Sequence, residues 1–401
     1  MLPYFQYSRE PIKSIYLICF FLSFLVRIPF WALTNLLPSW RPRRSWPLSR
    51  TIRVKFMRTL LGGLFQTSFD MVHVDPEKLG GTGEGIQLVW VEPTPDLVVG
   101  EIQEAAKINN IESVRLAGVW YGGRGKDANA ASQPAGPDEK VFYELHGGGW
   151  VIGNAGKKWD SAYFCERMVE TVEGYNSAFQ IEYRKSRGPP FLRQGAFPAA
   201  IIDAVAGYNY LVKVLGFKPS NIIVTGESAG GNLAFALVRY LNINNFPSLP
   251  IPRAQFLLCP TADWGRSHVG PESAMERNTN SDYVHWFVGG WGANALRGAL
   301  PESELINNSW ISPGGLRMPH VKGQFAGMPP TLIMAGDAEM TLDGVTTLRD
   351  RILADNPADT LTYIEYPDTT HVAMTVKWHE PQATQGYVDL AKWVESFDGD
   401  K

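Results

Sequence analysis

The feature that most constrains the fold of this chain is the pentapeptide Gly-Glu-Ser-Ala-Gly at residues 226–230 and the segments that flank it. An apolar run at 222–224 precedes the pentapeptide, and a run with helical character follows it. A serine between a strand and a helix sits at a tight turn, where glycines on both sides relieve backbone crowding. The positive N-terminal end of the helix would then face charge that develops at the serine. The context therefore predicts that Ser228 is a nucleophile.

A second motif, His146-Gly147-Gly148-Gly149-Trp150, directly follows the apolar run 141–145. A glycine-rich turn lets backbone N–H groups converge on a substrate oxygen, and with the N–H of Ala229 it would form an oxyanion hole. The loss of one such donor typically costs about 2.7–4 kcal/mol of transition-state stabilisation. A triple glycine alone is more often a flexible turn, but its pairing with the pentapeptide favours a catalytic role.

The general base should come late in the chain, because the serine, acid and histidine follow one another in that order in this arrangement. His371 lies on a loop after the strand-like run 361–366, whereas His379 stands beside Glu380-Pro381, where a solvated or capping role is expected. We therefore predict that His371, and not His379, takes the Ser228 proton.

The acid should follow the strand-like run 331–334, where Asp337, Glu339 and Asp343 compete. Both Asp and Glu serve in such triads, so the chemistry alone does not choose among them. The carboxylates that are not used should cap the helix near Asp343 or face solvent.

Alternating patterns predict an α/β fold with a mainly parallel sheet, flanking helices and an antiparallel edge at the start. Strand-like runs occur at 86–91, 114–120, 141–145, 178–183, 222–225, 255–258, 331–334 and 361–366. Helical patterns occur at 158–173, 199–214, 230–241, 343–354 and 384–397. Residues 122–140 are rich in Gly, Pro and charge, which predicts an exposed loop.

The interval 260–330 interrupts this alternation. Loops of roughly seventy residues are rare in compact domains, so a helical insertion that caps the carboxyl ends of the strands is expected, with an ordinary surface excursion as the alternative. Its aromatic residues include Trp264, Trp286, Phe287, Trp291 and Trp310. The predicted organisation is an anchor with a basic flank at 1–50, a cap region with the first edge strands at 51–135, and a catalytic domain at 136–401.

The N-terminal region predicts a membrane anchor. Residues 14–26 carry no charge, and 14–37 could span a bilayer as a helix, although Arg27 costs about 2.5–3.5 kcal/mol on insertion scales and Pro29 would kink the helix. A cleaved signal peptide is the rival, but no small-x-small cleavage pattern follows the apolar core. An interfacial or re-entrant hairpin is the third possibility. The arginines that follow the anchor favour a cytosolic catalytic domain. A glycosylation sequon at Asn307 would matter only on the lumenal side, so the orientation stays open.

Composition excludes several other classes of protein. The net charge of −3, from 37 basic and 40 acidic residues, gives no basic field for a nucleic-acid partner. The three cysteines, Cys19, Cys165 and Cys259, cannot form a disulfide framework, and no pair has metal-ligand spacing. The sequence contains no phosphate-cradling loop or nicotinamide fingerprint, so we predict neither a cofactor nor a metal.

These motifs resemble the hormone-sensitive-lipase branch of the α/β-hydrolases, in particular the steryl acetyl hydrolase and arylacetamide deacetylase types. The matching stretches are HGGGW at 146–150, EYR at 182–184, FPAAIIDA at 197–204, GESAGGN at 226–232 and THV at 370–372. The resemblance covers 141–397 and implies an α/β-hydrolase fold with a helical cap, an N-terminal transmembrane helix, and oxyanion donors at Gly148, Gly149 and Ala229.

The same resemblance favours Glu339 over Asp337 as the acid. Family members carry the acid in a G-x-x-acid-x-L-x-D pattern, and Glu339 stands three residues after Gly336 and four before Asp343. Glu in place of the commoner Asp, and a slightly different spacing at 340–342, are departures that keep Asp337 as a rival. Glu227 also replaces a commoner Asp, and we expect little consequence.

The resemblance implies a serine esterase that releases short acyl groups, in particular acetyl, from lipophilic alcohols such as sterols or secondary metabolites, through an acyl-enzyme. It also implies a location in the endoplasmic reticulum membrane. A long-chain lipid hydrolase or an amide hydrolase would use the same machinery. A non-catalytic ligand-binding or receptor protein on this scaffold is the alternative of another class, and the presence of both Ser228 and His371 argues against it.

Overall fold

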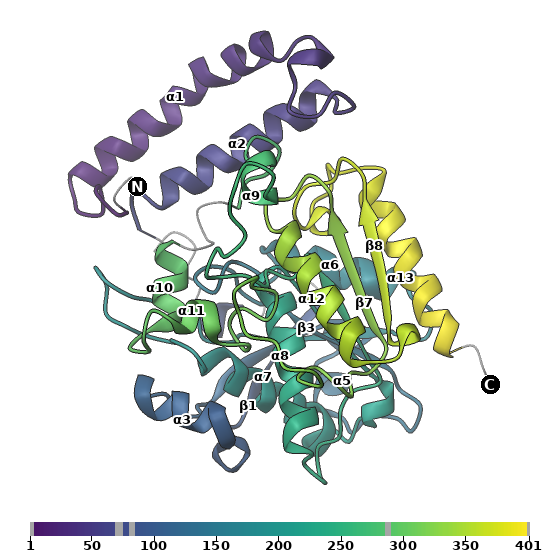
Figure 1. Cartoon of the computed structure of the whole chain (residues 1–401). Helices are drawn as coiled ribbons and strands as arrows, with labels where there is room; N and C mark the ends of the chain where they lie inside the picture. Colours follow the sequence, from purple (N-terminus) through teal and green to yellow (C-terminus); the bar gives the residue numbers. More distant parts are fainter. Residues whose placement is uncertain (1–3, 69–74, 80–84, 285–289, 399–401) are drawn as a thin grey trace.

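The computed structural model describes residues 4–68, 75–79, 85–284 and 290–398. Eight strands form one central sheet in the order β1-β2-β4-β3-β5-β6-β7-β8 (Figure 1). The strands are β1 (Ile86–Val91), β2 (Leu116–Gly122), β3 (Val141–Leu145), β4 (Ser177–Ile181), β5 (Ile222–Glu227), β6 (Ala254–Leu258), β7 (Thr331–Gly336) and β8 (Leu361–Tyr366).

Strand directions agree with the sequence prediction. β1 pairs antiparallel with β2, and β2 pairs antiparallel with β4, whereas every other neighbouring pair is parallel. All residues of β3 to β7 are buried, as expected for parallel strands that helices cover on both faces. The prediction of a mainly parallel sheet with an antiparallel edge at its start is confirmed.

The longer helices form two layers, one on each face of the sheet. The buried apolar side chains of α7 (Ala199–Asn209), α8 (Ala229–Asn244) and α12 (Leu342–Asp355) belong to one core cluster. Those of α6 (Asp160–Thr171) and α13 (Gln382–Asp398) belong to the second. α3 (Gly100–Asn109) lies near the β1 edge (Figure 1). The helix predicted at 199–214 changes at Asn209 into a π-helical turn, Tyr210–Val214.

Single 3₁₀ turns make short connections elsewhere in the described part of the chain. They lie at Pro38–Trp40, Pro76–Lys78, Pro95–Leu97, Pro219–Asn221, Ala358–Thr360 and Ala373–Thr375.

The N-terminal helices form a pair at one end of the molecule (Figure 1). α1 (Ile12–Thr34) packs along α2 (Leu48–Leu64), where the ring of Phe20 fills the space that a Cβ on Gly63 would need. Trp46 Nε1 donates to the Asp368 carbonyl at 2.7 Å, which ties the chain just before α2 to the catalytic body. α1 is long and apolar enough to cross a membrane, a criterion that a signal sequence also meets.

Residues 122–140 are mostly exposed, as their composition predicted, but they are not all loop. They contain α4 (Gly123–Lys126) and α5 (Ala128–Ser132). The buried Arg124 forms an ion pair with Glu139 at 2.6 Å, and its guanidinium lies 5.2 Å from the ring of Trp120. A buried guanidinium needs such partners, and the ion pair folds the segment onto the sheet edge.

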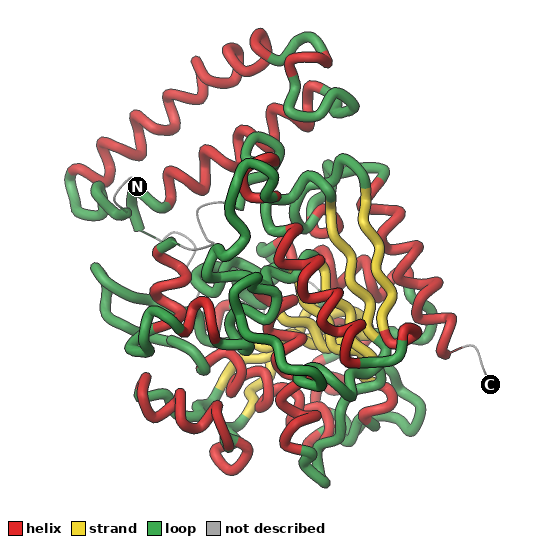
Figure 2. Tube along the Cα trace, in the orientation of Figure 1, coloured by secondary structure: helices red, strands yellow, loops and turns green. Residues whose placement is uncertain are grey.

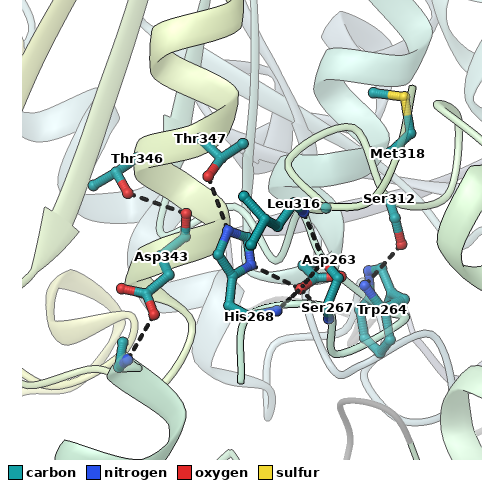
Figure 3. A network of polar contacts seen from close by, with 12 residues as sticks. Asp263, Trp264, Ser267, His268, Ser312, Leu316, Met318, Asp343, Thr346 and Thr347 are labelled. Carbon is teal, nitrogen blue, oxygen red and sulfur yellow. Dashed lines mark hydrogen bonds and ion pairs between the residues drawn. The ribbon is translucent and has the colours of Figure 1, made fainter. Parts of the chain in front are cut away.

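The interval 260–330 is less helical than predicted. Its described helices, α9 (Ala274–Arg277), α10 (Trp291–Arg297) and α11 (Glu304–Asn307), are short, and much of the interval is loop (Figure 2). Polar side chains hold these loops instead: Asp263 Oδ2 accepts from Ser267 N, and His268 Nδ1 lies 2.9 Å from the same oxygen (Figure 3). The predicted cap residues Trp286 and Phe287 lie outside the described residues.

Candidate active site

Ser228 stands at the sharp turn between β5 and α8. Its φ is +58°, a conformation that is costly for a residue with a Cβ. The turn is also crowded, since a Cβ at Gly230 would overlap the Leu145 carbonyl oxygen. Ser228 N donates to the Leu258 carbonyl at 2.9 Å, which fixes the turn against β6. Glycine is therefore required at position 230, where the backbone of Leu145 approaches closely.

The structure brings Ser228, His371 and Glu339 into one chain of hydrogen bonds. His371 Nε2 lies 2.8 Å from Ser228 Oγ, and His371 Nδ1 lies 2.6 Å from Glu339 Oε2. A carboxylate can only accept, so Nδ1 carries the proton and Nε2 is free to accept from the serine hydroxyl. The contact distances are those required of a nucleophile, a general base and the group that orients the base.

Glu339 lies on the loop after β7, where two donors besides His371 hold its carboxyl group. Gly336 N donates to Oε1 at 3.0 Å, and Thr341 Oγ1 donates to Oε2 at 2.8 Å. Burial opposes protonation of His371, but the hydrogen bond and charge of Glu339 and the charge of Asp282 outweigh burial and raise the pKa of His371 above its ordinary value. The imidazolium that a proton transfer would create is therefore stabilised.

The other two candidate acids face elsewhere. Asp337 Oδ1 accepts from Asp368 N at 2.6 Å, and Oδ2 lies 3.4 Å from Arg43 Nη1. Asp343 Oδ2 accepts from Ala274 N at 2.7 Å. Only Glu339 among the three is hydrogen-bonded to the imidazole of His371.

His379 is not the solvated residue that its sequence neighbours indicated. It is buried, and its Nε2 accepts from Thr370 N at 3.1 Å. Burial, assisted by the charge of Arg50, lowers the pKa of His379 to about 3. A neutral ring can accept this bond, so His379 braces the loop that carries His371.

The glycine-rich turn lies against the serine turn. A Cβ on Gly147 would overlap Glu227 Oε2, so Glu227, for which we expected little consequence, packs directly on the motif. Gly148 and Gly149 have φ of +113° and +63°, values that favour glycine. The buried ring of His146 stacks on Tyr183 at 4.1 Å between centroids, and Tyr183 Oη donates to the His146 carbonyl at 2.6 Å. His146 is therefore a support of the turn.

Two threonines near the triad were missed in the sequence analysis. Thr261 Oγ1 lies 3.2 Å from Ser228 Oγ, and Thr341 Oγ1 lies 3.3 Å from His371 Nδ1. Thr261 follows β6, the neighbour of β5, so its place at the carboxyl end of an adjacent parallel strand was an available signal.

Cys259, Glu339 and His371 each present one potential metal ligand within 4.8 Å of the others. The 2.6 Å hydrogen bond already occupies Nδ1 of His371 and the facing oxygen of Glu339. Burial raises the pKa of the Cys259 thiol well above its ordinary value, so the thiolate that a metal requires is disfavoured. The arrangement suits proton transfer better than metal ligation.

A cavity of about 930 Å³ lies beside the glycine-rich turn, where Val151 and Ile152 form part of its wall. Ser228, Glu339 and His371 do not line it, whereas Thr261 and Thr341 line a small cavity of about 20 Å³. The hydrogen-bond geometry, and not the larger hollow, therefore identifies the candidate site.

Comparison with known proteins finds a matching family and several similar hydrolases. A family described as the alpha/beta hydrolase fold matches residues 142–375. An acetyl-hydrolase of Streptomyces hygroscopicus is 27% identical over 258 residues, which cover 63% of this chain and 74% of the relative. An esterase of Acinetobacter venetianus is 26% identical over 292 residues, which cover 72% and 83%.

Solved structures resemble this chain over most of its length. An esterase/lipase from an uncultured bacterium aligns with a TM-score of 0.57 at 20% identity and covers 86% of this chain and 98% of its own. A bacterial esterase of the hormone-sensitive lipase family aligns with a TM-score of 0.54 at 20% identity and covers 86% and 91%. At this level of identity the alignments establish the fold.

Proposed function

Since the chain belongs to the α/β-hydrolase fold family and is a carboxylic ester hydrolase of its hormone-sensitive-lipase branch, we propose that Ser228 is its nucleophile, His371 its general base and Glu339 its acid. The observation that carries this proposal is the unbroken hydrogen-bond chain from Glu339 through His371 to Ser228.

The proposed reaction proceeds in two steps through an acyl-enzyme. Ser228 Oγ attacks the ester carbonyl while its proton passes to His371 Nε2, and the imidazolium then protonates the departing alcohol. In the second step His371 takes a proton from water, whose oxygen attacks the acyl carbon. The bond from that carbon to Ser228 Oγ then breaks, the imidazolium returns its proton to Oγ, and the acid is released. We assign the oxyanion contacts to the backbone N–H groups of Gly148, Gly149 and Ala229. The close approach of Gly147 to Glu227, the residue before Ser228, supports this assignment.

A fluorophosphonate probe tests the nucleophile directly. The wild type should be labelled and should hydrolyse p-nitrophenyl acetate, whereas Ser228→Ala should do neither. Ser396→Ala is a matched control, because the Ser396 hydroxyl donates to the Trp393 carbonyl within α13, in a helix that carries no residue of the proposed triad. Labelling that persists in Ser228→Ala, or that is absent from folded wild type, would show that Ser228 is not the nucleophile.

We further propose that the substrates are short acyl esters, in particular acetates, of lipophilic alcohols such as sterols or secondary metabolites. The acetyl-hydrolase among the relatives supports the acyl group, and an apolar N-terminal helix supports substrates that partition into lipid. A series of p-nitrophenyl esters of rising chain length, followed by sterol acetates and aryl acetamides, separates this proposal from a long-chain lipase or an amidase. Equal turnover of long acyl chains would contradict it.

The proposed role of α1 is a single-pass anchor in the endoplasmic reticulum membrane. Its apolar side chains are widely exposed, for example Leu25 and Val26, each 73% exposed. A spanning α1 must leave α2, whereas an α1 that stays on α2 would lie in the plane of the membrane surface. A membrane-impermeant maleimide applied to Cys19, which is exposed on α1, distinguishes the two: protection in intact microsomes supports spanning.

A further inference from the structure

One segment of the interval between β6 and β7, residues 278–283, contacts both loops that carry the proposed acid and base. We call it the bridging segment. It lies apart in sequence from the loop after β7, which holds Glu339, and from the loop after β8, which holds His371. The two loops continue the neighbouring strands β7 and β8, and Ala338 N donates directly to the Thr369 carbonyl at 3.1 Å. This direct bond joins the loops before Glu339 and His371, and the bridging segment adds contacts at and beyond those two residues.

The bridging segment binds the acid loop through four successive residues of that loop. Asn278 Nδ2 donates to the carbonyls of Asp337 and Glu339 at 2.9 and 2.8 Å. Ser281 Oγ donates to the Ala338 carbonyl at 3.0 Å. Asp282 Oδ2 accepts from Met340 N at 2.7 Å. The backbone on both sides of Glu339 is thus held from one direction.

The same segment binds the base loop through Tyr283. Tyr283 Oη donates to the His371 carbonyl at 2.8 Å in a buried contact. Asp282 precedes it and is fully buried, and its other oxygen, Oδ1, accepts from Tyr283 N at 2.8 Å. One carboxylate therefore links the residue that holds His371 to the backbone that follows Glu339.

We propose that Asp282 and Tyr283 are positioning residues for the triad: together they fix the distance between the loop of the acid and the loop of the base. This proposal rests on the proposed function. A displacement of about 1 Å between reacting groups can cost about 10²-fold in rate, and a second connection between the two loops, beside their direct hydrogen bonds, limits such displacement.

The charge of Asp282 adds to this geometric role. Burial raises the pKa of Asp282 to about 6, and the charge of His371 acts in the opposite direction. Asp282 and Glu339 are the two carboxylates whose charges support the protonated form of His371, while the hydroxyl of Tyr283 and the thiol of Cys259 are neutral neighbours. Proton uptake by His371 therefore favours the ionised form of Asp282.

Two arginines of the N-terminal region, one on α2 and one just before it, also bind the bridging segment. Arg58, on α2, donates through Nη1 to the Asp282 carbonyl at 3.1 Å. Arg43, which precedes α2, donates through Nη2 to Asn278 Oδ1 at 2.9 Å. The segment is thus held at both its ends by residues outside the catalytic body.

The test uses Asp282→Asn and Tyr283→Phe in the full chain, with kcat, KM and the pH profile of p-nitrophenyl acetate hydrolysis as readouts. Tyr283→Phe removes one hydrogen bond and should lower kcat about 10-fold with little change in KM. Asp282→Asn cannot accept from both Met340 N and Tyr283 N, since its amide nitrogen is a donor. It should lower kcat about 10- to 100-fold.

A second readout separates positioning from general destabilisation. Loss of the Asp282 charge should lower the pKa of His371, so the acid limb of kcat/KM should move to lower pH in Asp282→Asn and stay in place in Tyr283→Phe. Tyr208→Phe is the matched control, because its buried hydroxyl donates to the Pro250 carbonyl at 2.8 Å away from the triad, and its kinetics should equal those of the wild type.

The outcomes distinguish this proposal from the function on which it rests. If both variants keep the wild-type kcat and acid limb while Ser228→Ala is inactive, the bridging role is wrong and the hydrolase assignment stands. If the wild type itself neither reacts with a fluorophosphonate nor hydrolyses esters, the proposed function fails. Should Asp282→Asn fail to fold, Tyr283→Phe decides alone: an unchanged kcat overturns the proposal.

Discussion

Replacement of Glu339 by glutamine tests the proposed acid most sharply. Glu339 uses both oxygens, with Gly336 N donating to Oε1 at 3.0 Å and His371 Nδ1 lying 2.6 Å from Oε2. Glutamine keeps the shape of the side chain but turns one of these acceptors into a donor. If the amide nitrogen faces Gly336, two donors meet in a buried site, at a cost of about 1–3 kcal/mol.

The other orientation of the glutamine damages catalysis itself. An amide nitrogen that faces His371 requires Nδ1 to accept, which moves the ring proton to Nε2, where Ser228 needs an acceptor. This loss of the correct tautomer typically lowers kcat about 10⁴-fold, which corresponds to about 5.4 kcal/mol in the barrier. We expect Glu339→Gln to lose about 10³- to 10⁴-fold in kcat with little change in KM.

Asp337→Asn is the matched control, since Asp337 is two residues away and was the rival acid. Its ion pair with Arg43 is partly exposed, with side-chain exposures of 31% and 24%, so its loss should cost about 1 kcal/mol or less. Initial rates of p-nitrophenyl acetate hydrolysis and unfolding temperatures would be measured for both variants. A kcat for Glu339→Gln within about tenfold of the wild type, or an equal loss in Asp337→Asn, would refute the assignment.

Three further predictions concern the base His371, the serine turn and the buried His379. The pKa of His371 is raised, so its imidazolium holds the proton more tightly than a free imidazole does, and kcat/KM should fall as pH drops, with a midpoint above about 6.5. A midpoint below this value would contradict the stabilisation of the imidazolium by Glu339 and Asp282. Gly230→Ala should destabilise the protein by about 3 kcal/mol or more in chemical denaturation, because its Cβ would overlap the Leu145 carbonyl, whereas Gly136→Ala, with no neighbour closer than 3.7 Å, should unfold like the wild type. The pKa of His379 is lowered to about 3, so below about pH 6.5 this histidine is protonated in the unfolded chain but neutral in the folded chain. The contribution of His379 to stability should therefore fall from about pH 6.5 down to about pH 3, and His379→Gln should flatten that decline in unfolding temperature.

The sequence by itself determined the succession of strands and helices along the chain and the positions of the two glycine-rich turns. Hydrophobic periodicity is a property of neighbouring residues, and the conformation of a tight turn depends on local backbone sterics, so both can be read along the chain. For the same reason Ser228 and His371 could be named from the segments around them.

Only the tertiary structure decided which carboxylate faces the imidazole. Glu339 and Asp337 lie on one loop and differ in the direction of their side chains, which depends on contacts with Gly336 on one side and Arg43 on the other. The burial of His379 was equally invisible, since it depends on packing against a loop whose partners lie far away in sequence. The contacts of residues 278–283 with two distant loops arise in the same way, because a hydrogen bond between remote segments leaves no local pattern.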